Sequence, residues 1–131
     1  MRRHGLGDET EVIDGDFTES AGNAAAQRLL AADLPTAVVC ANDRVAVGVV
    51  DALRRAGVDV PGEVSVTGCD DSMLARLGHI DLTSVSQMAR EQADQAVAAV
   101  IERLDTGRAE PRAVVLTPEL VVSTTTAPPG G

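Results

Sequence analysis

A chain of 131 residues has room for one modest domain, and 44% hydrophobic residues suffice for a folded core. The net charge of −9 argues against direct nucleic-acid binding, which requires a clustered basic face. No apolar run approaches the length of a membrane span, and no signal peptide precedes the first strand. We therefore expect a cytoplasmic protein that has no membrane partner.

The core must be built almost entirely from aliphatic side chains, because the sequence contains one Phe, no Trp and no Tyr. Such a composition favours a sheet of branched residues covered by alanine-rich helices. In chain order, the elements expected are a strand at 11–14, a helix at 18–30, a strand at 36–40, a helix at 42–56, a strand at 63–67, a helical turn at 72–77, a strand at 83–86, a long helix at 88–105, and strands at 112–116 and 119–123.

The helix at 42–56 has the clearest pattern in the chain. Its apolar positions recur at i, i+3, i+4 and i+7, which places them on one stripe: Ala46, Val49, Val50 and Leu53. Gly57 is well placed to end this helix, and Gly107 to end the long one. The alternation of strands and helices predicts an α/β fold, a parallel sheet flanked by helices.

Polar and aromatic side chains follow four of the expected strands. Ligands of open parallel sheets bind beyond the carboxyl ends of the strands, so these positions are expected to share one crevice. They are Phe17, the Asn42–Asp43 pair, the Asp70–Asp71 pair and Gln87. Carboxylate and amide groups bind hydroxyls, and an aromatic ring offers a flat apolar face to a sugar or a base. The combination predicts binding of a small polyhydroxylated or heterocyclic ligand.

Each of these residues also has a structural interpretation. Asn42 or Asp43 can cap the helix at 42–56, and one of the two can cap while the other faces a ligand. The Asp70–Asp71 pair can form a turn, and Phe17 can be a core residue. Their joint position at strand ends is the stronger signal.

No catalytic or metal-binding motif stands out, so neither an enzyme nor a cofactor is expected. His4 and His79 fall in expected loops, and no nucleophile is tied to either. Asp70 and Asp71 lack a third oxygen ligand for a cation. Cys40 and Cys69 are not at metal-ligand spacing and are expected to be buried thiols, although the sequence leaves open whether they lie close enough to pair.

Several ordered segments resemble the lactose/galactose repressor family. The similar segments are Asp14–Gly22, Pro35–Gly48, Val60–Asp71, Leu82–Gln87 and Thr117–Pro128. The resemblance implies a periplasmic-binding-protein-like effector domain in which two lobes close over a sugar or a purine. It implies that Phe17 stacks on the effector, that Asn42 and Asp70 bind it by hydrogen bonds, and that Gln87 lies near the hinge. It leaves Asp43 as the helix cap.

The resemblance also implies an incomplete two-lobe domain. Residues 1–126 would form a partial effector-binding and dimerisation domain, followed by a disordered tail at 127–131. Residues 1–86 and 117–126 would belong to the C-terminal lobe, and residues 87–116 to the other lobe. The DNA-binding head would lie outside this chain, so DNA is expected to be a partner only through that absent domain.

Two surfaces are expected to join copies of the chain into a homodimer. The apolar stripe of the long helix lacks its partner lobe, and a contiguous exposed stripe tends to find another surface. Val47 lies on its helix opposite the core stripe, and the family resemblance implies a dimer contact there. The alternative for Val47 is an ordinary exposed valine.

The function predicted from these observations is effector sensing by a bacterial transcriptional repressor. The alternatives are a transport-type solute-binding protein of the same fold and, less strongly indicated, an enzyme that uses Asp70 and Asp71.

Overall fold

The computed structural model describes Gly5 and residues 10–128 of the chain. The interpretations of His4 and of the tail beyond residue 128 lie outside these described residues. The elements in chain order are α1 (Glu19–Leu30), β1 (Ala37–Val39), α2 (Asp43–Arg55), β2 (Ser65–Thr67), β3 (Ser84–Ser86), α3 (Ala89–Thr106) and β4 (Glu119–Val121).

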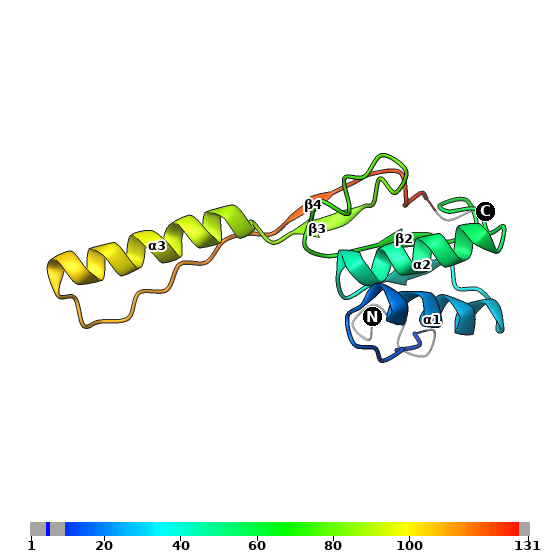
Figure 1. Cartoon of the computed structure of the whole chain (residues 1–131), viewed down its shortest axis with the longest axis horizontal. Helices are drawn as coiled ribbons and strands as arrows, with labels where there is room; N and C mark the ends of the chain where they lie inside the picture. The colour runs from blue at the N-terminus through cyan, green and yellow to red at the C-terminus, as the bar shows by residue number, and fades with distance from the viewer. Residues whose placement is uncertain (1–4, 6–9, 129–131) are drawn as a thin grey trace.

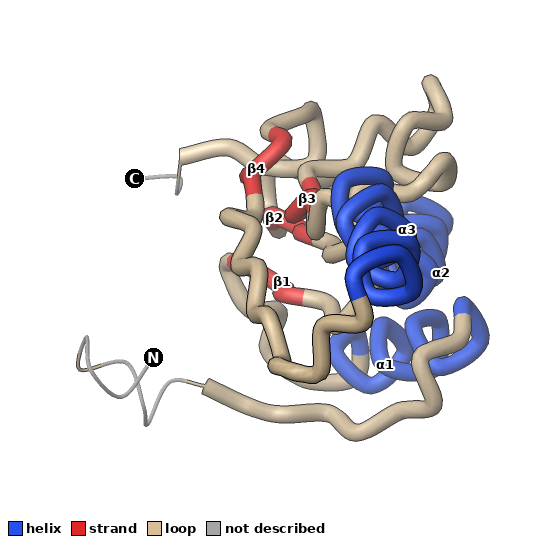
Figure 2. The backbone as a smooth tube through the Cα atoms, turned by 90° about the vertical axis from the view of Figure 1, so that its left-hand side faces the viewer, coloured by secondary structure: helices blue, strands red, loops and turns tan. Residues whose placement is uncertain are grey.

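The strands form a parallel group with an antiparallel edge. β1 pairs with β2 in parallel, with Val38 opposite Val66, and a parallel bridge between Thr67 and Thr83 links β2 to the segment that leads into β3. β4 runs antiparallel to β3. The α/β prediction is confirmed, but both α1 and α2 lie on the same side of the strands (Figure 2), so helices cover one face only. On the other face Val39 is 73% exposed.

Two predicted strands are wrong. Residues 11–14 and 112–116 are not assigned to a strand, and within the described residues neither segment pairs with a neighbour. Val12 is 79% exposed and Val115 is 91% exposed. A strand needs an adjacent strand for its backbone N–H and C=O groups, and local apolar alternation does not supply one.

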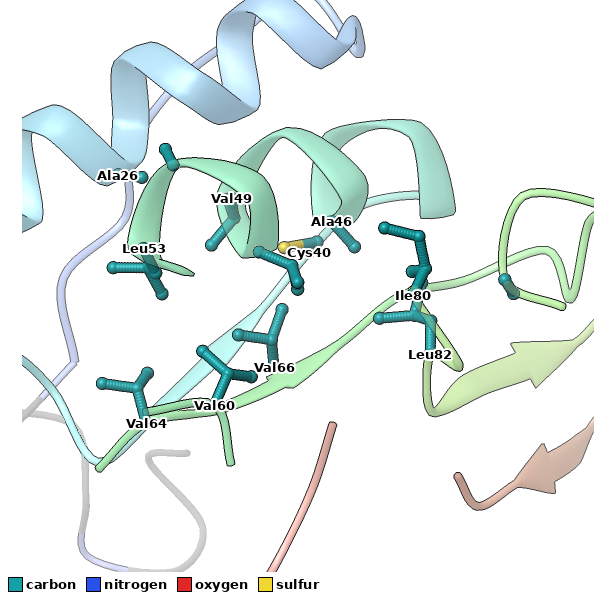
Figure 3. Close-up of a cluster of buried hydrophobic side chains, with 13 residues drawn as sticks. Ala26, Cys40, Ala46, Val49, Leu53, Val60, Val64, Val66, Ile80 and Leu82 are labelled. Carbon is teal, nitrogen blue, oxygen red and sulfur yellow. The ribbon is translucent and has the colours of Figure 1, made fainter. Parts of the chain in front are cut away.

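The core lies between α2 and the strands (Figure 3). The four residues of the predicted α2 stripe are at most 1% exposed, which confirms the stripe: Ala46, Val49, Val50 and Leu53. They pack with Val64 and Val66 around β2 and with Leu82 before β3. This packing fixes the start of α2 relative to the ends of β1 and β2.

Helices α1 and α2 approach at two glycines. A Cβ on Gly48 would lie 2.1 Å from the Glu19 carbonyl oxygen, and one on Gly22 would lie 2.1 Å from the Val45 carbonyl oxygen. Glycine is therefore required where the two backbones touch. The crossing brings the segment before α1 beside the N-terminus of α2 (Figure 1).

Val47 is half-buried and packs against the core cluster, so the expectation that it points away from the core is wrong. Val47 lies one helical turn before Val50 on α2, and the core cluster extends to that side of the helix. The assignment of Val47 to a dimer interface stays a prediction.

Helix α3 extends away from the other elements (Figure 1), and none of its residues is buried. It ends as predicted at Gly107, whose φ of 65° is left-handed. Its apolar stripe is exposed at Val97, Val100, Ile101 and Leu104, by 53–79%. Across the residues that the structure describes, no helix has the length and apolarity needed to cross a membrane.

The start of the expected disordered tail is attached to the domain. Ala127 forms two hydrogen bonds with the Ser65 hydroxyl, one through its N–H and one through its carbonyl oxygen.

Cys40 and Cys69 are free thiols, the first buried and the second half-buried. Burial raises the pKa of the Cys40 thiol from 9.0 to about 12. Because the folded state favours the neutral thiol, the free energy of unfolding should fall as pH rises from about 9 towards 12. The chain contains no Tyr and no Lys, and its 11 Arg side chains stay charged in this range, so few other side chains titrate there.

Urea unfolding at a series of alkaline pH values measures this effect. Cys40→Ala should lose part of the decline in stability, whereas the matched variant Cys69→Ala should keep it. An equal decline in all three proteins would contradict the assignment to Cys40.

Candidate functional site

A cleft of about 450 Å³ lies where the segment before α1, the start of α2 and the loop after β2 meet. Its lining residues are Asp16, Phe17, Thr18, Asn42, Arg44, Asp70, Ser72 and Leu74. Three of the four predicted effector residues, Phe17, Asn42 and Asp70, are thus brought together. The fourth, Gln87, is not a lining residue, but it contacts Asp70.

Phe17 lines this cleft, and its backbone conformation places the side chain there. Its φ is 65°, a left-handed conformation that is unusual for a bulky residue, and its side chain is 62% exposed. The Asn42 amide nitrogen donates to the Phe17 carbonyl oxygen at 3.1 Å. Phe17 is therefore not a core residue, and its ring remains free to stack on a ligand.

The turn around Phe17 is fixed by its two neighbours. Thr18 caps α1, its hydroxyl accepting from the Ala21 N–H at 3.2 Å, as predicted. The Asp16 carboxylate accepts from both the N–H and the hydroxyl of Thr18. These two hydrogen bonds lower the pKa of Asp16, so the carboxylate that lines the cleft is charged at neutral pH.

Asn42, not Asp43, caps α2. The Asn42 side-chain oxygen accepts from the Val45 N–H at 2.8 Å, which corrects the assignment of the cap to Asp43. One amide N–H and one oxygen lone pair of Asn42 remain for a ligand. Asp43 is turned into the protein and is 1% exposed, because it binds Ser72 and Ser84 instead of the end of its own helix.

The two adjacent aspartates have different partners. The Gln87 amide nitrogen donates to Asp70 at 2.7 Å, and Asp70 is exposed in the cleft. Asp71 instead forms an ion pair with Arg76 at 2.6 Å, and this carboxylate raises the pKa of Arg76. The pair therefore does not act as one cation site: Asp70 lines the cleft, whereas Asp71 binds Arg76, five residues further along the same loop.

Five lining residues were not predicted: Asp16, Thr18, Arg44, Ser72 and Leu74. The signal for Arg44 was its position two residues after Asn42, at the same end of the sheet. The Ser72 hydroxyl oxygen is buried and is the one such side-chain atom that has no hydrogen-bond partner among the described residues. Carboxylates, a guanidinium, an amide and an aromatic ring thus converge, a set suited to hydroxyl groups around an apolar ring face.

The family of the chain follows from comparison with known proteins. The periplasmic binding protein-like domain matches residues 1–126 of the chain. The chain belongs to this family. The chain is similar to the HTH-type transcriptional repressor PurR of Photobacterium profundum, with 38% identity over 85% of this chain and 34% of that protein. The chain spans about a third of the length of the curated relatives that it matches.

Two solved structures share the fold of this periplasmic binding protein-like domain. One is a LacI transcriptional regulator from a Rhodococcus species, with 42% identity, a TM-score of 0.86, and coverage of 97% of this chain and 47% of the other. The second is the transcriptional regulator CelR in complex with cellobiose, with 31% identity, a TM-score of 0.76, and coverage of 94% and 40%. The resemblance to the lactose/galactose repressor family is thereby confirmed.

Proposed function

We propose that this chain is an effector-sensing module of a bacterial transcriptional repressor, acting in the cytoplasm without catalysing a reaction. The observation that carries the proposal is the convergence of Phe17, Asn42 and Asp70 on one cleft of about 450 Å³. The cleft has the size of a small-molecule site. The similarity to transcriptional regulators supports the sensor over a transport protein or an Asp-dependent enzyme.

The lining residues favour a sugar as the effector. The Phe17 ring is a surface for the apolar face of a pyranose, and Asp70, Asn42 and Arg44 supply acceptors and donors for its hydroxyls. The solved relative bound to cellobiose agrees with this chemistry. A purine base is the second candidate, because the same ring can stack on a heterocycle.

The mechanism that follows is a shift between two arrangements of the complete protein. An effector that binds one arrangement more tightly raises its population, and only this difference in affinity changes DNA binding. The DNA-binding element would lie outside this chain.

The effector class can be tested with cellobiose, maltose, D-ribose and adenine against the complete repressor. Isothermal titration calorimetry should detect binding of at least one saccharide, and binding should raise the thermal midpoint. Binding of adenine alone would overturn the sugar assignment, and binding of none would count against the proposed function.

We also propose that the chain forms a homodimer through the exposed stripe of α3. Four large apolar side chains at helical spacing form a continuous strip: Val97, Val100, Ile101 and Leu104. Ile101→Glu places a charge at its centre and should convert the dimer to a monomer. Analytical ultracentrifugation measures the change, and Gln95→Glu on the opposite side of α3 is the matched control. A monomeric wild-type chain with α3 folded would contradict this proposal.

A further inference from the structure

The carboxylate of Asp43 is buried at the start of α2, outside the set of residues that line the cleft. It is 1% exposed, and it accepts from the Ser72 backbone N–H at 2.7 Å and from the Ser84 hydroxyl. Ser84, at the start of β3, is fully buried. A buried carboxylate is retained only where donors replace its lost water. Asp43 therefore joins α2, the loop after β2, and β3.

The same two residues hold most of the 69–72 loop. The Asp43 N–H donates to the Cys69 carbonyl oxygen at 2.8 Å, and the Asp71 N–H donates to the Ser84 hydroxyl oxygen at 3.1 Å. With the bond from Ser72, three of the four loop residues are attached to Asp43 or Ser84.

The loop needs such attachment because its backbone is strained. Asp70 has a φ of 118° and Asp71 a φ of 49°, both in the region that favours glycine. Conformations of this kind persist only where surrounding contacts impose them, and they gather at functional sites.

The approach of Asp43 to this loop is close. A Cβ on Gly68, the residue before the loop, would lie 2.4 Å from the Asp43 Oδ1 atom. The position therefore has room for the carboxylate only because residue 68 is glycine. The contact between Asp43 and Gly68 therefore belongs to the packed interior, because the Asp43 side chain is buried and cannot rotate freely as a surface side chain does.

The loop carries two groups that line the cleft. They are Asp70, whose carboxylate is held by Gln87, and Ser72, whose buried hydroxyl oxygen has no partner among the described residues. We infer that Asp43 and Ser84 form a positioning pair, which holds the strained 69–72 loop so that Asp70 and Ser72 present their side chains to the effector. The inference rests on the proposed function for its consequence in binding, but its geometric part stands without a ligand.

Amide hydrogen exchange of the full chain without ligand tests the geometric part. Ser84→Ala should accelerate exchange of the Asp71 and Ser72 amides by about tenfold or more, as expected for loss of contacts to a buried charged group. The amides of α2 should keep their rates. Ser86→Ala, on the same strand, is the matched control and should leave the loop unchanged. Unchanged loop amides in Ser84→Ala, or equal acceleration of every amide, would overturn the inference.

A second variant covers the case in which Ser84→Ala does not fold. Asp43→Asn keeps the shape of the side chain and removes its charge, so the same two amides should accelerate, by a smaller factor. Equal rates in wild type and Asp43→Asn would overturn the inference as well.

A double-mutant cycle for affinity separates positioning from a general structural role. With cellobiose as the probe in the complete repressor, Ser84→Ala should weaken binding about tenfold in the wild-type background and only slightly in the Asp70→Asn background. Additive losses would overturn the positioning role. If wild type binds adenine alone, the sugar assignment fails and the cycle is measured with adenine. If wild type binds neither a saccharide nor adenine, the proposed function fails, and the exchange rates alone decide whether the pair holds the loop.

Discussion

Asp70→Asn is expected to weaken effector binding by about 10- to 100-fold, the factor that corresponds to losing hydrogen bonds to a charged group. One Asp70 oxygen is held by Gln87 at 2.7 Å, which directs the carboxylate in the cleft. No bond from the described residues reaches the other oxygen, Oδ2, which is therefore available to effector hydroxyls. Asn is preferred to Ala because it tolerates the left-handed side of the backbone map at this position.

Titration calorimetry of the complete repressor with cellobiose measures the loss. Asp71→Asn is the matched control, since its carboxylate is engaged by Arg76 and does not line the cleft. Affinity in that variant should change by no more than about threefold. Equal affinities of wild type and Asp70→Asn would remove Asp70 from the binding site.

Gly48→Ala is expected to lower the free energy of unfolding by about 3 kcal/mol, the upper part of the usual range for overpacking. The added Cβ would lie 2.1 Å from the Glu19 carbonyl oxygen and 3.0 Å from the Asn23 nitrogen. Both are backbone atoms, so no side-chain rotation relieves the clash, and α1 must move away from α2.

The displacement of α1 should also reach the cleft. Phe17 and Thr18 directly precede α1, and the contact from Asn42 to the Phe17 carbonyl spans the same crossing. Effector affinity should therefore fall even though Gly48 touches no ligand.

Urea unfolding and calorimetry measure the two effects of Gly48→Ala. Gly78→Ala is the control, because a Cβ there meets nothing within 4 Å. Equal stability of the Gly48 and Gly78 variants would show that the helices can separate at no cost, contrary to the packing described above.

The placement of the site was largely predictable. In parallel α/β sheets the strand ends share one edge, so Asn42 and Asp70 were expected together, and they line one cleft. Phe17 lines the same cleft although residues 11–14 are not a strand, because the segment before α1 lies beside the start of α2. The exact roles were not predictable. Asn42 and Asp43 are both good caps, and only the position of Ser72 and Ser84 in space decides that Asp43 turns inward.

The sequence by itself determined the features that depend on near neighbours. The α2 stripe follows from helical spacing, and the ends of α1 and α3 follow from the Thr18 cap and from Gly107. The tertiary structure alone decided which segments pair and which touch. Residues 11–14 and 112–116 are strand-like but unpaired, α1 and α2 touch at Gly22 and Gly48, and Val47 packs against the core. The physical reason is range: caps and periodicity act within a few residues, whereas strand pairing and close packing depend on residues far apart in the chain.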